Sequence, residues 1–246
     1  NALTKKQVID FYKQYYVTDN AVLVMVGAID SPKAHQLAEQ LTQDLPQGKP
    51  AADIPKALQL TKAEQIQIQF PSSQTVIRLG QVGIDHHNPD YFPLMVGNYI
   101  LGGGALVSRL AVEVREKRGL TYGITSLFTP MTGNGPFIIT LSTKNNQSAN
   151  ALKITEDTLN QFIIKGPDAQ ELNSAKKYLT GSFPLSLASN RAIGSVLLRM
   201  AFYHLPDNYL DNYVARINAV TVDKIRNAFK NHVSPDRLLL VSVGQS

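Results

Sequence analysis

The sequence predicts an α+β protein with a mixed or antiparallel sheet and helices packed on one face. Two pairs of short, alternating apolar segments are interleaved with helical segments, and a helical run with one closing apolar segment follows them. The composition agrees: 43% hydrophobic and 17% charged residues are ordinary for a globular protein, and 246 residues allow one large domain or two small ones. No apolar run approaches the roughly 20 residues that a membrane-spanning helix needs.

Residues 1–45 are predicted to form a helix, a strand and a second helix. Thr4 is a good N-cap residue, and Gln7 completes a capping box that starts the first helix. Residues 21–26, AVLVMV, are an uninterrupted apolar run, which predicts a buried strand. The second helix is expected at 31–45, with Pro32 in the first turn, where proline is tolerated.

Residues 46–62 are predicted to be a linker between residues 1–45 and a larger domain, 63–246. Three prolines, a glycine and several small residues lie between Pro46 and Pro55. This composition favours irregular chain over helix or strand. We therefore expect a domain boundary here.

The larger domain is predicted to start with a pair of strands at 65–70 and 75–84, separated by a proline-serine turn. A helix at 91–101 follows, and strands at 126–131 and 136–143 are joined by a glycine-containing turn. A helix is then expected at 148–165, and a second one starts at Asp168, where Glu171 completes a capping box. The remaining predicted elements are helices at 190–203, 208–217 and 222–231 and a strand at 238–243.

The stretch 101–122, LGGGALVSRLAVEVREKRGLTY, runs from a glycine triplet into an amphipathic helix with a basic end. Gly119 suits the left-handed position that ends a helix, because a residue with a Cβ atom is strained there. The alternating pattern of residues 120–127 predicts a strand. Arg115 and Tyr122 therefore flank a sharp helix-to-strand turn and can share one rim. The expected apolar face of the helix consists of Leu106, Leu110, Val112 and Val114.

The chain lacks several kinds of site. Gly102, Gly103 and Gly104 are not followed by Gly-Lys-Ser/Thr and form no G-x-G-x-x-G pattern, so they predict a mobile or closely approached backbone instead of a phosphate loop. None of the five histidines has the spacing of a zinc chelate, and cysteine is absent, so we expect no metal in this chain. The net charge of +5 comes from scattered basic residues, which favours a solvated surface over nucleic-acid binding.

Arg115 and Tyr122 are the candidate functional side chains. Both can donate hydrogen bonds to a developing oxyanion without being the nucleophile or the base. The alternative is a helix-end salt bridge and an aromatic residue of a strand, which composition alone favours.

Residues 3–27 align without a gap on residues 220–244. The identical pairs include the threonine caps, the turn aspartates and the terminal glycines, and all keep one offset. Apolar patterning alone produces some matches between helix–turn–strand units, but shared caps and turns favour a true repeat. The repeat implies that the last elements of a domain occur twice and that its body occurs once.

The run DHHNPDYFPLMVGNYILGGGALVSRLAVEVREKRGLTYGI resembles the second domain of the M16 (pitrilysin-type) zinc peptidases. P-D-Y/F before a helix, L-G-G-G, S-R-L and R-E-K-R-G-L-x-Y carry the resemblance, and the last of these is the specific one. The opening of the chain is similar to the end of the first domain of the family. The resemblance covers essentially the whole chain.

The resemblance implies a fold in which two similar α+β domains face each other around an extended peptide. Residues 1–45 then correspond to the last elements of a truncated first domain and residues 63–246 to the second domain, which binds no zinc. By motif position, Arg115 and Tyr122 contact the substrate, whereas the offset of Arg118 from Tyr122 does not fit. The glycine triplet Gly102–Gly104 is expected to shape the cavity wall.

The family's inverted zinc motif, H-x-x-E-H, is absent from this chain. Zinc is therefore expected in the missing or partner domain, on the same parent chain or on a separate subunit, and the isolated chain is expected to be inactive. The expected partners are that zinc-bearing M16 domain and an extended peptide substrate, with no nucleic acid and no membrane span. Family analogy favours a bacterial periplasmic or secreted location. The alternatives are a non-proteolytic structural or assembly subunit and a peptide-binding module of the same fold.

Overall fold

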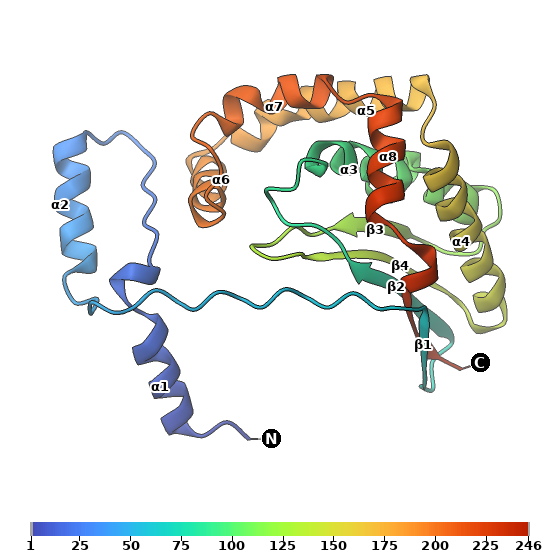
Figure 1. Ribbon diagram of the computed structural model, residues 1–246, viewed down its shortest axis with the longest axis horizontal. Helices are drawn as coiled ribbons and strands as arrows, with labels where there is room; N and C mark the ends of the chain where they lie inside the picture. The colour runs from blue at the N-terminus through green and yellow to red at the C-terminus, as the bar shows by residue number, and fades with distance from the viewer. Residues whose placement is uncertain (1, 246) are drawn as a thin grey trace. The chain divides into compact units, whose positions relative to one another are not determined.

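The computed structural model describes residues 2–245 and divides the chain into two compact units. The first unit contains the residues up to Ile54 together with Phe183–Tyr209, and the second contains Pro55–Ser182 together with the residues from Leu210 onward. The first division falls inside the stretch predicted to be a linker. Figure 1 shows both units.

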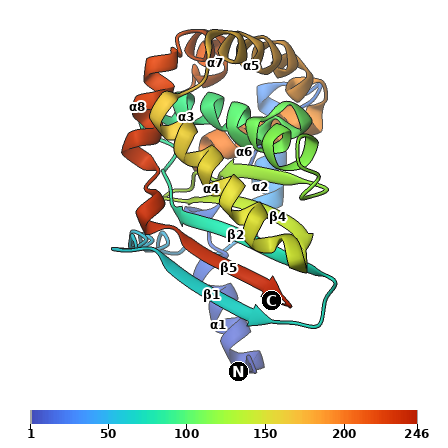
Figure 2. The same cartoon turned by 90° about the vertical axis from the view of Figure 1, so that its right-hand side faces the viewer.

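The second unit is built on a five-stranded mixed sheet, which confirms the predicted fold class. The strand order is β1-β5-β2-β4-β3; β1 pairs with β5 in parallel, and all other neighbours are antiparallel. Figure 2 shows β1, β5, β2 and β4 side by side. The strands are β1 (Glu64–Gln69), β2 (Gln74–Val82), β3 (Ile124–Phe128), β4 (Pro136–Lys144) and β5 (Leu239–Gly244).

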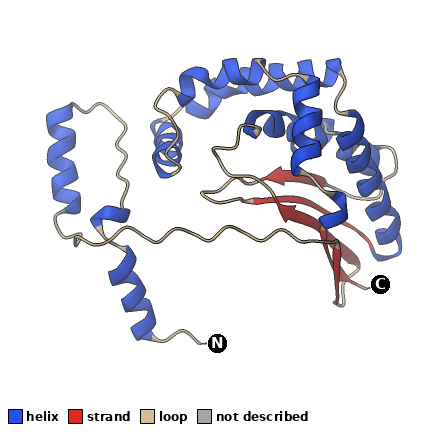
Figure 3. Cartoon of the chain, in the orientation of Figure 1, coloured by secondary structure: helices blue, strands red, loops and turns tan. Residues whose placement is uncertain are grey.

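Helices of the second unit cover one face of this sheet (Figure 3). Every second residue of β2 and β4 is buried on that face, while Val76 and Leu127 on the opposite face are exposed. This alternation is the period-two signature of a sheet with one covered side. α3 (Tyr91–Asn98) and α4 (Ser148–Lys165) contact the strands. The other helices of the unit are α5 (Ala169–Ser182), α7 (Tyr209–Asn218), whose first residue falls in the first unit, and α8 (Val222–His232).

Phe229 of α8 is at the centre of the core. It is fully buried, and its ring meets the rings of Phe162 and Phe128 at centroid distances of 4.8 and 5.9 Å. Gly97 of α3 allows this approach, because a Cβ atom there would lie 2.5 Å from the Phe229 ring. Burying a side chain of this kind contributes about 1.5–3 kcal/mol.

The first unit contains α1 (Lys5–Tyr15), α2 (Ser31–Thr42) and α6 (Asn190–Phe202). The predicted capping box of α1 is confirmed, with the side chain of Thr4 accepting from the amide of Gln7 and the side chain of Gln7 accepting in return. The second helix ends at Thr42 instead of residue 45, and Asp30 caps its start by accepting from the amide of Lys33.

The predicted strand at 21–26 is wrong for this structure, in which these residues form no strand. A strand requires a neighbour that satisfies its backbone groups, and none of the five strands pairs with this segment. The apolar run has the composition of a buried strand, but composition does not determine whether a neighbouring strand is present to pair with it.

Two further expectations about strands differ from the structure. β1 and β2 are not neighbours, since β5 lies between them. The run LLVSVG of β5 is mostly apolar and suits an interior strand, whereas EQIQIQ of β1 is polar on one face and suits an edge. The strand expected at 126–131 covers Ile124–Phe128 and stops before Pro130, which has no amide to donate.

The internal repeat is visible in the structure. α1 and α8 have the same length and equivalent threonine caps, and a short 3₁₀ turn follows each at the matching position. Their environments differ. α8 buries Ile225, Ala228 and Phe229, while α1 buries no residue.

This contrast gives a matched pair of substitutions. Ile225→Ala should lower the free energy of unfolding by about 2–5 kcal/mol, because it leaves a cavity beside α3. Val8→Ala removes the equivalent side chain of α1, which is 55% exposed, and should change the free energy of unfolding by less than about 0.5 kcal/mol. Urea denaturation followed by circular dichroism measures both values, and similar losses would contradict the assigned packing.

Candidate functional site

The stretch 99–122 does not continue α3 as a regular helix. A π-helical turn covers Tyr99–Gly103, a 3₁₀ turn covers Ala105–Val107, and a second π-helical segment covers Ala111–Glu116. Sequence reasoning missed both π segments, because no residue pattern distinguishes them from an α-helix. Such segments occur frequently at functional sites.

The predicted apolar face of this stretch is only partly correct. Leu110 and Val114 are fully buried, and Val112 is half-buried. Leu106 is 57% exposed, because it belongs to the 3₁₀ turn before the helix and not to the helix itself.

The glycine triplet is a place of close backbone approach. A Cβ atom on Gly102 would lie 2.5 Å from Ser126 Oγ, and one on Gly103 would lie 2.9 Å from Asn98 Nδ2. Asn98 and Ser126 are buried and hold each other: Asn98 Nδ2 donates to the Ser126 carbonyl at 3.1 Å, and Ser126 Oγ donates to Asn98 Oδ1 at 2.7 Å. Gly104 is similarly close to the carbonyl of Tyr99. Gly102 therefore packs directly against β3, whereas Gly103 and Gly104 closely approach the preceding turn, and both contacts agree with the close backbone approach that the sequence allowed.

Gly119 ends the helix as predicted. Its φ is +60°, its amide donates to the Arg115 carbonyl at 2.8 Å, and the amide of Leu120 donates to the Val114 carbonyl at 3.0 Å. These bonds satisfy the last carbonyls of the helix and reverse the chain toward β3. The turn brings Tyr122 back beside the helix end.

Arg115 and Tyr122 lie together, and we refer to them as the rim pair. The Arg115 Cζ atom lies 5.4 Å from the centroid of the Tyr122 ring, within the range of a cation–π contact. Tyr122 is 90% exposed and Arg115 is half-buried. The guanidinium and the phenol hydroxyl are both donors, so an acceptor approaching the rim can meet two of them.

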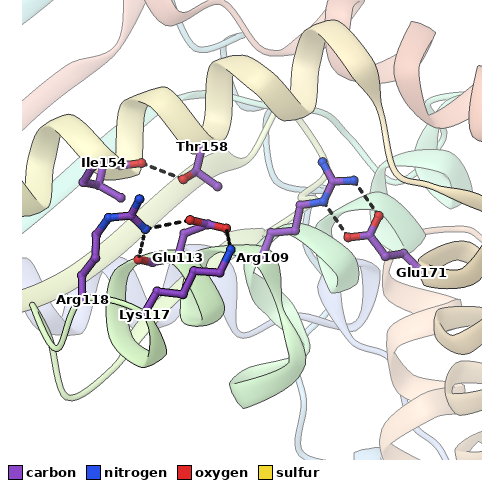
Figure 4. Close-up of polar contacts among 7 residues, drawn as sticks. All are labelled: Arg109, Glu113, Lys117, Arg118, Ile154, Thr158 and Glu171. Carbon is purple, nitrogen blue, oxygen red and sulfur yellow. Dashed lines mark hydrogen bonds and ion pairs between the residues drawn. The ribbon is translucent and has the colours of Figure 1, made fainter.

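The other two cations of the helix end bind Glu113. Lys117 Nζ donates to Glu113 Oε1 at 2.6 Å, and Arg118 Nη1 donates to Glu113 Oε2 and to its backbone carbonyl, both at 2.7 Å (Figure 4). The hydrogen bonds from Lys117 and then Arg118 lower the pKa of Glu113 below its usual value. Among residues 2–245, the helix-end salt bridge therefore involves Lys117 and Arg118, and Arg115 stacks on Tyr122 instead.

A second ion pair anchors the start of the same helix. Arg109 donates to both carboxylate oxygens of Glu171, at 2.6 and 2.5 Å (Figure 4). Its guanidinium also lies over the ring of Phe162, 5.1 Å from the ring centroid. Glu171 also accepts from the amide of Asp168, whose side chain accepts from the amide of Glu171, so the predicted capping box is present. The sequence predicted this capping box but contained no signal for the bond between Glu171 and Arg109.

The described part of the chain contains no cluster of three or more histidine, cysteine, aspartate or glutamate side chains placed to bind a metal ion. None of its helices has both the length and the apolar character that a membrane span requires. The rim pair can bind and orient an acceptor, but within residues 2–245 no metal-binding group accompanies it.

Comparison with known proteins identifies the class of protein. Residues 2–179 match the family model described as the peptidase M16 inactive domain, so the chain belongs to the M16 peptidase family, as the sequence motifs predicted.

The most informative relatives carry two different descriptions. The chain is 28% identical over 232 residues to an uncharacterized zinc protease of Streptomyces coelicolor, covering 92% of this chain and 50% of the relative. It is also 28% identical over 240 residues to a non-peptidase homolog of Helicobacter pylori, covering 94% of this chain and 54% of the relative. The chain thus spans about half the length of these relatives.

A solved structure supports the fold. The peptidase M16 inactive domain from Pseudomonas fluorescens is 40% identical and has a TM-score of 0.94, covering 99% of this chain and 58% of that chain. The mixed sheet with helices on one face is therefore the fold of this M16 domain.

The glycine triplet provides a test of the geometry. Gly102→Ala should lower the free energy of unfolding by about 1–3 kcal/mol, because the new methyl group must displace the Ser126 backbone and hydroxyl. Gly123→Ala, directly before β3 and with open space around its Cβ position, is the control and should be nearly neutral. Equal effects in thermal or urea unfolding would show that close approach does not constrain the triplet.

Proposed function

We propose that this chain is the half of an M16 peptidase that carries no zinc site. In this proposal, it lines the cavity that holds an extended peptide, and Arg115 and Tyr122 donate hydrogen bonds to the substrate carbonyl or to its oxyanion during hydrolysis. The observation that carries the proposal is the rim pair itself, two donors side by side with the tyrosine almost fully exposed.

The rim pair is suited to this role by charge and by rigidity. The Arg115 guanidinium offers several N–H groups, and the Tyr122 hydroxyl adds a further donor. The Gly119 turn connects the two residues, and the close approach of Gly102 to Ser126 holds the backbone before Arg115 and after Tyr122. Donors held in place before the reaction stabilise a developing oxyanion without a reorganisation cost.

The remaining chemistry requires a partner. We infer a zinc-bearing M16 domain, on the same parent chain or on a separate subunit, whose metal would polarise the attacking water. This chain would contribute binding and orientation, and Gly102–Gly104 would form part of the cavity wall. Its sheet-and-helix domain, residues 63–246, would face the zinc-bearing domain across the peptide.

Residues 1–45 would be the last elements of a domain similar to the second one, joined to it by the linker 46–62. Two features of the first unit support this proposal. α1 has the length, cap and following turn of α8, and its exposed Val8, Phe11 and Tyr12 occupy the positions of the buried Ile225, Ala228 and Phe229. Residues 22–27 occupy the repeat position of β5, an interior strand.

A second candidate function is a non-proteolytic structural or assembly subunit, or a peptide-binding module, of the same fold. The description of the Helicobacter pylori relative as a non-peptidase homolog favours this candidate. Zinc-dependent peptide hydrolysis by the assembled protein would exclude it.

Substitution of the rim pair tests the leading proposal. Arg115→Ala and Tyr122→Phe should each lower kcat/KM of the assembled, zinc-loaded protein by roughly 100-fold, as expected for losing one oxyanion donor, with zinc content unchanged. Arg118→Ala is the matched control, because Arg118 binds Glu113, and it should lower kcat/KM less than about threefold. Full activity of both rim variants would refute the role.

Hydrogen exchange tests the proposed origin of residues 1–45. The amides of residues 22–27 should exchange quickly in this chain alone and become protected in the protein that includes the zinc-bearing domain, since they would then pair as a strand. The amides of β5, already paired on both sides, should be protected in both samples and serve as the control. Unchanged fast exchange at 22–27 would contradict the proposal.

A further inference from the structure

The end of the helix that precedes Gly119 carries more positive charge than the rim pair uses. Arg115, Lys117 and Arg118 lie within four consecutive residues. Lys117 and Arg118 both bind Glu113, whereas no carboxylate of the described residues forms an ion pair with Arg115. Glu113 therefore binds Lys117 and Arg118 and leaves Arg115 without a carboxylate partner among the described residues.

The winding of the helix explains this separation. In the π-helical segment Ala111–Glu116, the backbone bond runs from the amide of Lys117 to the carbonyl of Val112, so residues four and five apart share a face. Glu113 consequently faces Lys117 and Arg118. Arg115 lies two positions after Glu113, on another face, where Tyr122 returns after the turn.

Glu113 also directs Arg118 away from the rim pair. Both side chains line a cleft of about 490 Å³ together with Ile154 and Thr158 of α4 (Figure 4). Arg115 and Tyr122 are absent from the described lining of this cleft. The ion pair thus keeps Arg118 on the α4 side of the helix, and Arg115 is left to determine the charge at the rim.

We propose that Glu113 is a specificity-determining positioning residue that selects against acidic peptides at the rim pair. The inference rests on the proposed function and adds a substrate class to it, namely peptides without acidic side chains beside the contacted carbonyl. With Glu113 in place, its carboxylate offsets one of the three positive charges and holds Lys117 and Arg118 on its own face of the helix, so that Arg115 is the cation at the rim. Without that carboxylate, the net charge of these four positions rises from +2 to +3 and Lys117 and Arg118 are released from it, so the helix end attracts acidic side chains more strongly.

The test compares two peptides that differ only in having glutamate or glutamine at the positions flanking the contacted carbonyl. The readout is the ratio of kcat/KM for the acidic peptide to that for the neutral peptide, measured with the assembled, zinc-loaded protein. Fluorescence anisotropy measures the dissociation constants of the same two peptides, and their ratio gives a second readout that requires no turnover. Glu113→Gln keeps the side-chain shape and removes the charge.

Glu113→Gln should raise the preference for the acidic peptide about fivefold, an effect that shrinks as salt is added. Glu116→Gln is the matched control, since it removes an equal charge from an exposed carboxylate of the same helix end that binds neither Lys117 nor Arg118. It should change the ratio less than about 1.5-fold. Adding Arg118→Gln to Glu113→Gln returns the net charge of residues 113, 115, 117 and 118 to its original value and should restore the original ratio.

Three results would overturn the proposal: an unchanged ratio in Glu113→Gln, an equal change in Glu116→Gln, or no restoration in the double variant. A purely structural role of Glu113 predicts equal losses for both peptides and no restoration. Failure of the proposed function gives a different result, because Arg115→Ala and Tyr122→Phe would then keep full activity. The ratio of the two peptides' dissociation constants would still show whether Glu113 disfavours the acidic peptide. Binding of neither peptide would refute both.

Discussion

The two hydrogen bonds between Asn98 and Ser126 are the constraint on which the candidate site depends. They join the last residue of α3 to the middle of β3, and both side chains are buried, so breaking one bond would leave a polar group without a partner in the core. Gly102 then passes Ser126 at a distance that admits no side chain. The helix carrying Arg115 follows this contact, and Tyr122 precedes β3, so one anchor positions both.

Local signals were sufficient for much of the fold. The capping boxes at Thr4 and at Asp168, and the left-handed glycine at 119, depend on neighbours within one turn, and the structure has all three. The strand order could not be read in the same way, because β1 and β5 are paired by contacts between distant parts of the chain. Residues 21–26 show the same limit: an apolar run indicates burial, but pairing depends on another segment.

The candidate site likewise has parts that the sequence predicts and parts that it does not. Arg115 and Tyr122 could be placed together from sequence because a single glycine turn connects their elements. The bond from Arg109 to Glu171 joins two helices that are far apart in the chain, and the grouping of Glu113 with Lys117 and Arg118 depends on π-helical winding. Tertiary packing determines the bond from Arg109 to Glu171, and the local winding of the helix determines which cations reach Glu113. The sequence pattern reveals neither the packing nor the π-helical winding.

The interior position of β5 has a consequence for how the chain folds. β5 follows every helix of its unit in sequence, yet it lies between β1 and β2, which are among the first elements made. Until the ribosome releases β5, the facing edges of β1 and β2 lack their partner, and the sheet is split into a lone strand and a three-stranded ribbon. Closing it requires the most sequence-distant pairing of the unit, which is slow and leaves strand edges open to other chains. A growing chain therefore remains vulnerable to aggregation until its final strand inserts.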